Sequence, residues 1–204
     1  MIKNIIFDFG DIFINLDKQG THKELSKLGV SLISDEMIAL CNQYEKGIIS
    51  TNDFIGIFEH RFPNVRKKDF VHSWNAVLKD FPNYRLEFIK ELAAQKKYRL
   101  FLLSNTNDLH ITWVQENWGD KRYREFKNCF EQFYLSHEIN FRKPEVEIFE
   151  FVLNKNSLKA NETLFVDDVS ENTFAAEKSG IHVWNLTPGK EDVIDLLTKN
   201  PHLF

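Results

Sequence analysis

Cysteine is scarce in this sequence, and long apolar runs are absent. The 204 residues include two cysteines, Cys41 and Cys129, which lie far apart and lack the spacing of metal ligands. This usage is typical of a reduced intracellular protein, so we expect a cytoplasmic location. No stretch approaches the ~20 apolar residues of a membrane-spanning helix, and the apolar run ahead of Asp8 is too short for a signal peptide. The sequence therefore predicts no membrane partner.

An excess of basic charge is also missing. Lysine and arginine number 26 against 30 aspartates and glutamates, which leaves a net charge of −4. A nucleic-acid-binding protein normally presents a basic face, and the longest basic run here, Arg66-Lys67-Lys68, is short. We therefore expect no nucleic acid as a partner.

Apolar residues are plentiful in spite of these absences. They make up 43% of the chain and include 19 phenylalanines, enough for a bulky core. The length allows one large domain, or one domain that carries a modest insertion.

The first apolar run, Ile5-Ile6-Phe7, leads into Asp8 and a glycine-bearing turn. A short apolar run bounded by turn residues is typical of a buried strand in a parallel sheet. Ligands of open α/β sheets bind beyond the carboxyl ends of the strands. Asp8 is therefore a candidate nucleophile or metal ligand, although an aspartate at this place can also simply cap the turn.

The next segment, from Asn15 to about Pro82, has apolar residues at helical spacing and no convincing strand. Ser50 or Thr51 is a candidate cap for one of its helices. The predicted apolar helix faces include Leu25, Leu28 and Leu32, then Met37, Leu40 and Tyr44, then Phe54, Ile57, Phe58 and Phe62, and then Phe70, Trp74, Val77 and Leu78. We predict a small helical insertion.

From Tyr84 onward, predicted strands and helices alternate, which indicates a parallel sheet. The fold class we predict is α/β, a doubly wound parallel sheet with a small helical cap after the first strand. Residues 1–15 and 83–204 would form the core domain, and residues 16–82 the cap. The predicted strands are 98–103, 133–135, 163–166 and 181–184, and the predicted helices are 86–93, 108–118, 145–154, 170–179 and 191–199.

Polar clusters follow three predicted strands: Asp8, Ser104-Asn105 and Asp167-Asp168, with Lys143 between the last two. Parallel strands would bring these clusters to one edge of the sheet. Three carboxylates so placed would repel one another without a cation between them, and Mg²⁺ prefers such oxygen ligands. A hydroxyl, a helix-start amide and a lysine suit phosphoryl oxygens. The combination indicates phosphoryl transfer to a carboxylate.

Four short motifs resemble, in order and spacing, those of the haloacid dehalogenase (HAD) superfamily. They are Asp8-Phe9-Gly10-Asp11-Ile12, Leu103-Ser104-Asn105-Thr106, Arg142-Lys143-Pro144 and Phe165-Val166-Asp167-Asp168. The helical insertion resembles the cap domain of that superfamily. The segments 103–110, 134–136 and 142–145 look closest to its sugar-phosphatase branch, which includes glucose-1-phosphate phosphatases.

The resemblance implies a role for each matching residue around the phosphoryl group. Asp8 would be the nucleophile that becomes an aspartyl-phosphate. Ser104 would hydrogen-bond a phosphoryl oxygen, helped by the backbone amide of Asn105. Lys143 would neutralise phosphoryl charge and hold Asp8 in place.

The resemblance also implies a Mg²⁺ site. Its ligands would be Asp8, the carbonyl of Gly10 and Asp168, with Asp167 bound directly or through water. Asn172 would orient Lys143 or the acid pair.

One position departs from the pattern of most phosphatases in the superfamily. They carry an aspartate two positions after the nucleophile as general acid/base, and here that position is Gly10. General acid–base help is typically worth ~10²–10⁴-fold, so we expect slow turnover or a preference for good leaving groups. The sugar-phosphatase branch commonly has glycine there, and Asp11 is a candidate substitute.

Some residues outside the motifs are candidates for substrate selection. The resemblance places Gly47, Trp74 and Asn75 of the cap near the pocket, although packing and turn roles explain them equally well. His110 with Trp113 could also reach the pocket, but surface or packing roles are favoured.

The sequence therefore predicts a Mg²⁺-dependent phosphatase that hydrolyses a small phosphorylated metabolite, with a sugar phosphate as the favoured substrate. One alternative is a metal-free dehalogenase, against which the acid pair Asp167-Asp168 argues. Another is a phosphate-binding or interaction module that has lost catalysis through Gly10. The sequence sets neither the substrate nor the oligomeric state.

Overall fold

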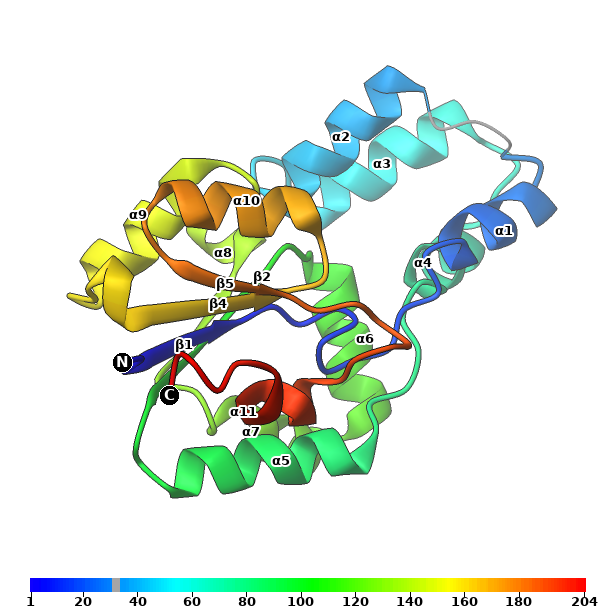
Figure 1. Ribbon diagram of the computed structural model, residues 1–204. Helices are drawn as coiled ribbons and strands as arrows, with labels where there is room; N and C mark the ends of the chain where they lie inside the picture. Colours follow the sequence, from blue (N-terminus) through cyan, green and yellow to red (C-terminus); the bar gives the residue numbers. More distant parts are fainter. Residues whose placement is uncertain (31–33) are drawn as a thin grey trace.

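The described residues form a parallel sheet with helices on both faces and four further helices at one end (Figure 1). The structure, a computed structural model, describes residues 1–30 and 34–204. Five strands lie in the order β3-β2-β1-β4-β5, and all their pairings are parallel. Their bounds are β1 Asn4–Phe7, β2 Arg99–Ser104, β3 Gln132–Leu135, β4 Thr163–Asp167 and β5 His182–Asn185. The predicted α/β fold class is confirmed.

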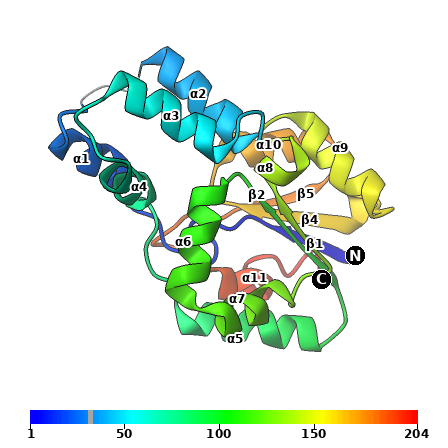
Figure 2. The ribbon, with the colours of Figure 1, turned by 180° about the vertical axis from the view of Figure 1, so that it is seen from behind.

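Alternate side chains of β1 enter different hydrophobic layers. Ile5 and Phe7 pack with α5, α6, α7 and α11 on one face, whereas Ile6 packs with α9 and α10 on the other. Figures 1 and 2 show these two helical layers from opposite sides. Side chains alternate along a strand, so a strand covered on both faces needs a continuous apolar run. The helices are α5 Asn83–Ala94, α6 Asp108–Trp118, α7 Asp120–Lys127, α8 Ser136–Ile139, α9 Val146–Lys155, α10 Ser170–Lys178 and α11 Leu196–Lys199.

Several segments of the core differ from the sequence prediction, which included neither α7 nor the short helix α8 and drew the C-terminal helix differently. Helix α7 was not predicted because its eight residues are mostly charged and only Tyr123 and Phe126 are buried. The predicted helix 191–199 is a 3-10 turn over Val193–Asp195 followed by the single turn of α11. The side chain of Asp192 caps the 3-10 turn, which explains why the segment begins later than its apolar spacing suggests.

The described residues between β1 and α5 form four helices, which pack around a third, largely aromatic cluster. They are α1 Gly20–Lys27, α2 Asp35–Glu45, α3 Thr51–Arg61 and α4 Lys67–Asn75. Tyr44 stacks on Phe54 with ring centroids 4.2 Å apart, and Phe58 stacks on Phe70 at 3.7 Å. The Ser50 side chain caps α3 by accepting from the backbone N–H of Asp53. The predicted face residue Leu32 lies outside the described residues.

Two linkers join this cluster to the rest of the chain. They run antiparallel, with a bridge between Leu16 and Leu78, and Asn15 exchanges backbone hydrogen bonds of 2.9 Å with Lys79 and Asp80. We propose that the chain divides here into the predicted core, 1–15 and 83–204, and the predicted cap, 16–82.

The helices are short throughout the described chain. The longest, α5, has 12 residues. No helix of residues 1–30 and 34–204 combines the length and apolar character that a bilayer crossing needs.

Candidate active site

The register of the sheet brings the predicted polar clusters to one edge. Phe7 lies opposite Leu102 of β2 and Val166 of β4, so Asp8, Ser104 and Asp167 follow at neighbouring strand ends. The backbone N–H of Asp8 donates to the carbonyl of Val166 at 2.8 Å, which extends the pairing by one residue. The sheet therefore places the polar clusters of neighbouring strand ends side by side, as the sequence predicted.

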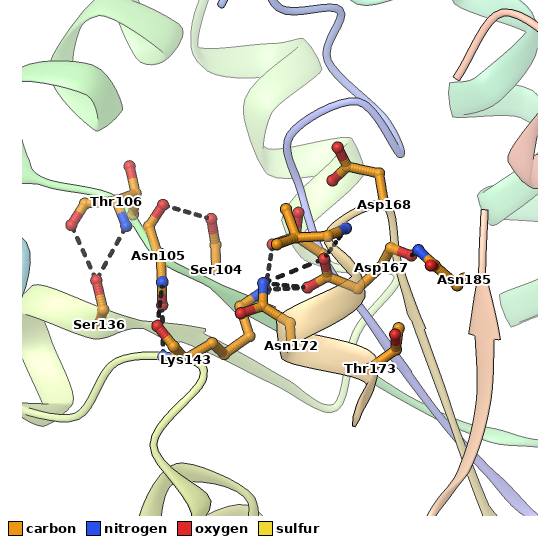
Figure 3. A network of polar contacts seen from close by, with 12 residues as sticks. Ser104, Asn105, Thr106, Ser136, Lys143, Asp167, Asp168, Asn172, Thr173 and Asn185 are labelled. Carbon is orange, nitrogen blue, oxygen red and sulfur yellow. Dashed lines mark hydrogen bonds and ion pairs between the residues drawn. The ribbon is translucent and has the colours of Figure 1, made fainter. Parts of the chain in front are cut away.

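Lys143 joins the two buried carboxylates of this edge. Its side chain is 1% exposed, and its Nζ lies 2.6 Å from Asp8 Oδ1 and 2.7 Å from Asp167 Oδ2. The Asn105 side chain holds the Lys143 backbone, accepting from its N–H at 2.9 Å and donating to its carbonyl at 2.8 Å (Figure 3). Asn105 therefore fixes the lysine from a different strand end. The predicted contact of the Asn105 backbone amide with phosphate stays a prediction.

One lysine cannot neutralise two buried carboxylates. Burial is the largest effect on Asp8, followed by the opposing attraction of Lys143 and the repulsion from Asp167, and together they raise its pKa to about 7. Burial alone would lower the pKa of Lys143, but Asp167 and Asp8 outweigh it and raise that pKa. The lysine stays charged, and the site keeps an excess of negative charge.

A third carboxylate adds to this excess. Asp8, Asp167 and Asp168 each offer an oxygen, and these three oxygens lie within 4.8 Å of one another. Hard divalent cations such as Mg²⁺ take carboxylate oxygens of this kind. The donor set and its uncompensated charge therefore fit the predicted metal.

Asp167 is held by its own turn and by Asn172. It is fully buried, its Oδ1 accepts from the Val169 N–H at 2.8 Å, and Asn172 Nδ2 lies 3.0 and 3.2 Å from its two oxygens. Asn172 was predicted to orient Lys143 or the acid pair, and its hydrogen bonds are to Asp167 of that pair (Figure 3).

Lys18 also reaches this cluster, and sequence reasoning missed it. Its Nζ lies 2.7 Å from Asp168 Oδ2 and 3.1 Å from Asp11 Oδ2. The other oxygen of Asp11 accepts from the Leu16 N–H at 3.0 Å. A lysine in a linker carries no sequence signal of such a contact. Both oxygens of Asp11 are engaged, which argues against its use as a proton donor.

A cavity of about 190 Å³ adjoins the strand ends. Gly10 and Ser104 line it on the sheet side, and within the described residues the buried Ser104 hydroxyl makes one long hydrogen bond, 3.5 Å to the Asn105 carbonyl. His110 and the cap residue Glu45 also line it. His110 stacks on Trp74, and burial lowers its pKa to about 4, so its ring is neutral at pH 7.

Gly47, Trp74 and Asn75, which were predicted to lie near the pocket, are not among the described lining residues of this cavity. Gly47, with a φ of +66°, packs so closely on the His137 carbonyl that a Cβ would clash with it. Trp74 donates to Asn107 Oδ1 at 3.3 Å. Within the described chain the buried Asn75 Oδ1 has no hydrogen-bond partner. A role of these three residues in substrate choice stays a prediction.

Comparisons with known proteins agree with this geometry. The sequence model of the family described as haloacid dehalogenase-like hydrolase matches residues 5–186. The chain is 27% identical over 199 residues to a D-ribitol-5-phosphate phosphatase of Bacteroides thetaiotaomicron, covering 94% of this chain and 95% of that protein.

Solved structures of similar chains contain the expected metal. A HAD family enzyme of Bacteroides thetaiotaomicron in complex with magnesium is 34% identical, with a TM-score of 0.86 over 96% of this chain and 98% of that one. A wild-type complex with magnesium and inorganic phosphate from the same organism is 32% identical, with a TM-score of 0.79 over 94% and 97%. These structures hold magnesium, and the acidic cluster of this chain fits it, so the predicted cofactor is confirmed. The family match covers most of the sequence, so this chain belongs to the haloacid dehalogenase-like hydrolase family and is an enzyme of it, as predicted.

Proposed function

We propose that this chain is a Mg²⁺-dependent phosphatase that hydrolyses a small phosphorylated metabolite, a sugar or polyol phosphate, through phospho-Asp8. The observation that carries the proposal is the contact of Lys143 with both Asp8 and Asp167 at the edge of the sheet, beside a third carboxylate. The phosphatase names and magnesium complexes of similar proteins support it.

Each residue has a part in the proposed reaction. Asp8 attacks phosphorus, the bond to the leaving oxygen breaks, and water later hydrolyses the aspartyl-phosphate. Lys143 holds Asp8 in its attacking position and balances phosphoryl charge. The Ser104 hydroxyl donates to a phosphoryl oxygen.

The carboxylates Asp8 and Asp168, with the carbonyl of Gly10, hold the metal, and Asp167 joins them directly or through water. Bound Mg²⁺ supplies charge stabilisation for the phosphoryl oxygens. Asn172 keeps Asp167 in position.

Proton donation to the leaving oxygen is the step that this site supports least. Gly10 has no side chain to donate a proton, and both Asp11 oxygens are engaged by Leu16 and Lys18. The proposed enzyme therefore turns over slowly with poor leaving groups.

The test is phosphate release from p-nitrophenyl phosphate and a panel of sugar and polyol phosphates. We expect activity that needs Mg²⁺ and stops with chelator, and that falls by ~10³-fold or more in Asp8→Asn. Asp120→Asn, an exposed residue of α7, is the matched control and should keep full activity.

The same experiment separates the alternatives. Activity on haloacids that chelator leaves unchanged would favour the dehalogenase. Binding of Mg²⁺ and phosphate without turnover on any ester would favour the binding module.

A further inference from the structure

The cavity beside the strand ends has one charged residue among its described lining. Apart from Gly10 and the polar residues near Ser104, its walls are largely aliphatic and aromatic, including Ile14, Val77 and Leu78. His110 is the neutral ring described above. Glu45, at the C-terminal end of α2 in the cap, is the exception.

Arg142 holds Glu45 from outside the cavity. Arg142 Nε and Nη2 lie 3.2 and 3.0 Å from the same carboxylate oxygen, Glu45 Oε2. Among the described residues no protein donor contacts Glu45 Oε1. Since Glu45 is a lining residue and Arg142 is not, a bound molecule meets the carboxylate before it meets the guanidinium.

The pair also connects the cap to the catalytic lysine. Arg142 immediately precedes Lys143, and the side chains of Glu45 and Arg142 are both about one quarter exposed, at 26% and 24%. A partly buried carboxylate held in one position by two hydrogen bonds is a fixed acceptor. Its position therefore does not depend on the arrival of a substrate.

We propose that Glu45 selects the leaving group: it accepts a hydrogen bond from a hydroxyl of a neutral polyol or sugar and repels a substrate that carries a carboxylate. This inference rests on the proposed phosphatase function and deepens it by naming the residue that selects the neutral substrate class. A fixed carboxylate accepts a hydrogen bond from a hydroxyl group and repels another carboxylate at the same place. Attraction of one substrate and repulsion of the other together produce specificity.

Two small esters isolate this effect. Glycerol 3-phosphate and 3-phosphoglycerate have the same carbon chain length, but the first ends in a hydroxymethyl group and the second in a carboxylate. The quantity measured is the ratio of kcat/KM for the neutral ester to kcat/KM for the acidic one. We expect the unaltered protein to prefer the neutral ester.

Three variants show whether the charge of Glu45 sets this ratio. In Glu45→Gln, which keeps the shape and loses the charge, the ratio should fall by about tenfold or more. In Glu45→Asp, which keeps the charge, it should stay closer to that of the unaltered protein. Glu145→Gln is the matched control, because it breaks the neighbouring cap-to-core pair of Lys46 and Glu145 at 2.5 Å and should leave the ratio unchanged.

The outcomes are distinct. Turnover by the unaltered protein with an unchanged ratio in Glu45→Gln overturns this inference and leaves the phosphatase proposal intact. An equal shift in Glu145→Gln also overturns it, because docking of the cap would then explain the effect. Absence of Mg²⁺-dependent turnover on both esters and on p-nitrophenyl phosphate overturns the proposed function and this inference with it.

Discussion

At the scale of single residues, the turn after Asp8 combines a glycine in place of the usual acid with an aspartate in a left-handed conformation. Gly10 replaces the usual acid, and a Cβ there would lie 2.8 Å from a methyl carbon of Leu16. Asp11 adopts a φ of +54°, a conformation in which aspartate and asparagine are enriched among non-glycine residues. The contacts of Asp11 with Leu16 and Lys18 suit a residue that shapes the turn.

We therefore expect Asp11→Asn to keep most of the activity. Asparagine tolerates the same φ and can still accept from the Leu16 N–H, so kcat on an alkyl phosphate should fall by less than ~10-fold, whereas loss of a general acid costs ~10²–10⁴-fold. The measurement is kcat against pH for an alkyl phosphate. A fall of a hundredfold with loss of the basic limb of the profile would identify Asp11 as the acid, and Lys18→Met controls for loss of the ion pair.

At the scale of elements, α5 braces the segment that follows the nucleophile. Arg85 is 8% exposed, and its Nη1 donates to the Phe13 carbonyl at 3.1 Å and to Asn15 Oδ1 at 2.9 Å. Its Nη2 donates to Asp192 at 2.8 Å. One buried guanidinium thus joins a core helix, the start of the linker and the C-terminal segment.

Arg85→Ala should lower the free energy of unfolding by about 2–4 kcal/mol, because it leaves buried acceptors without their donor. Chemical denaturation at pH 7 measures this. The matched control is Lys90→Ala on the same helix, which removes an exposed pair with Glu87 at 3.3 Å and should change the free energy by less than ~0.5 kcal/mol. Equal effects of the two substitutions would contradict the bracing role.

The pH dependence of the Arg85 effect has a definite sign. Burial works to raise the pKa of Asp192, but hydrogen bonds from Arg85 and Tyr84 outweigh it and lower that pKa. The stabilisation is therefore present above the unfolded value of ~3.9 and is lost as pH falls through the lowered folded pKa. The difference between Arg85→Ala and the unaltered protein should shrink in acid.

At the scale of the whole molecule, the acidic cluster ties metal binding to the stability of the fold. Asp8 follows β1 and the other two acids come from the end of β4, so a bound cation would join two central strands. Without metal, the raised pKa of Asp8 means that the folded protein holds a proton that the unfolded chain loses above pH ~3.9. The stabilisation that this proton gives to the folded state is present in acid and is lost as pH rises through about 7.

Mg²⁺ should therefore raise the Tm more at pH 8 than at pH 6, since the metal needs ionised Asp8 and competes with its proton. Each tenfold excess over the Kd adds ~1.4 kcal/mol to the free energy of unfolding. Thermal unfolding with Mg²⁺ or chelator at the two pH values measures this. In Asp8→Asn most of the pH dependence of the Mg²⁺ effect should disappear, and an equal effect of Mg²⁺ at both pH values in the unaltered protein would contradict the argument.

Much of the fold and part of the site could be predicted from local pattern. The apolar runs ending at Asp8 and Asp167 indicated buried parallel strands, and such strands end at one edge of a sheet. The aromatic helices after Asn15 indicated the insertion. Helix α7 could not be predicted, because two buried rings among charged residues give too weak a period.

The sequence by itself determined the fold class and which polar clusters would meet, because the apolar strand runs and the alternation of strands with helices carry that information. Only the tertiary structure decided three contacts. The Asn105 side chain hydrogen-bonds the backbone of Lys143, Lys18 forms an ion pair with Asp168, and Glu45 of the proposed cap lines the cavity. These contacts join residues 38 to 150 positions apart or depend on how the cap docks on the core. No local pattern encodes them, since the direction of a side chain toward residues distant in the sequence follows from packing alone.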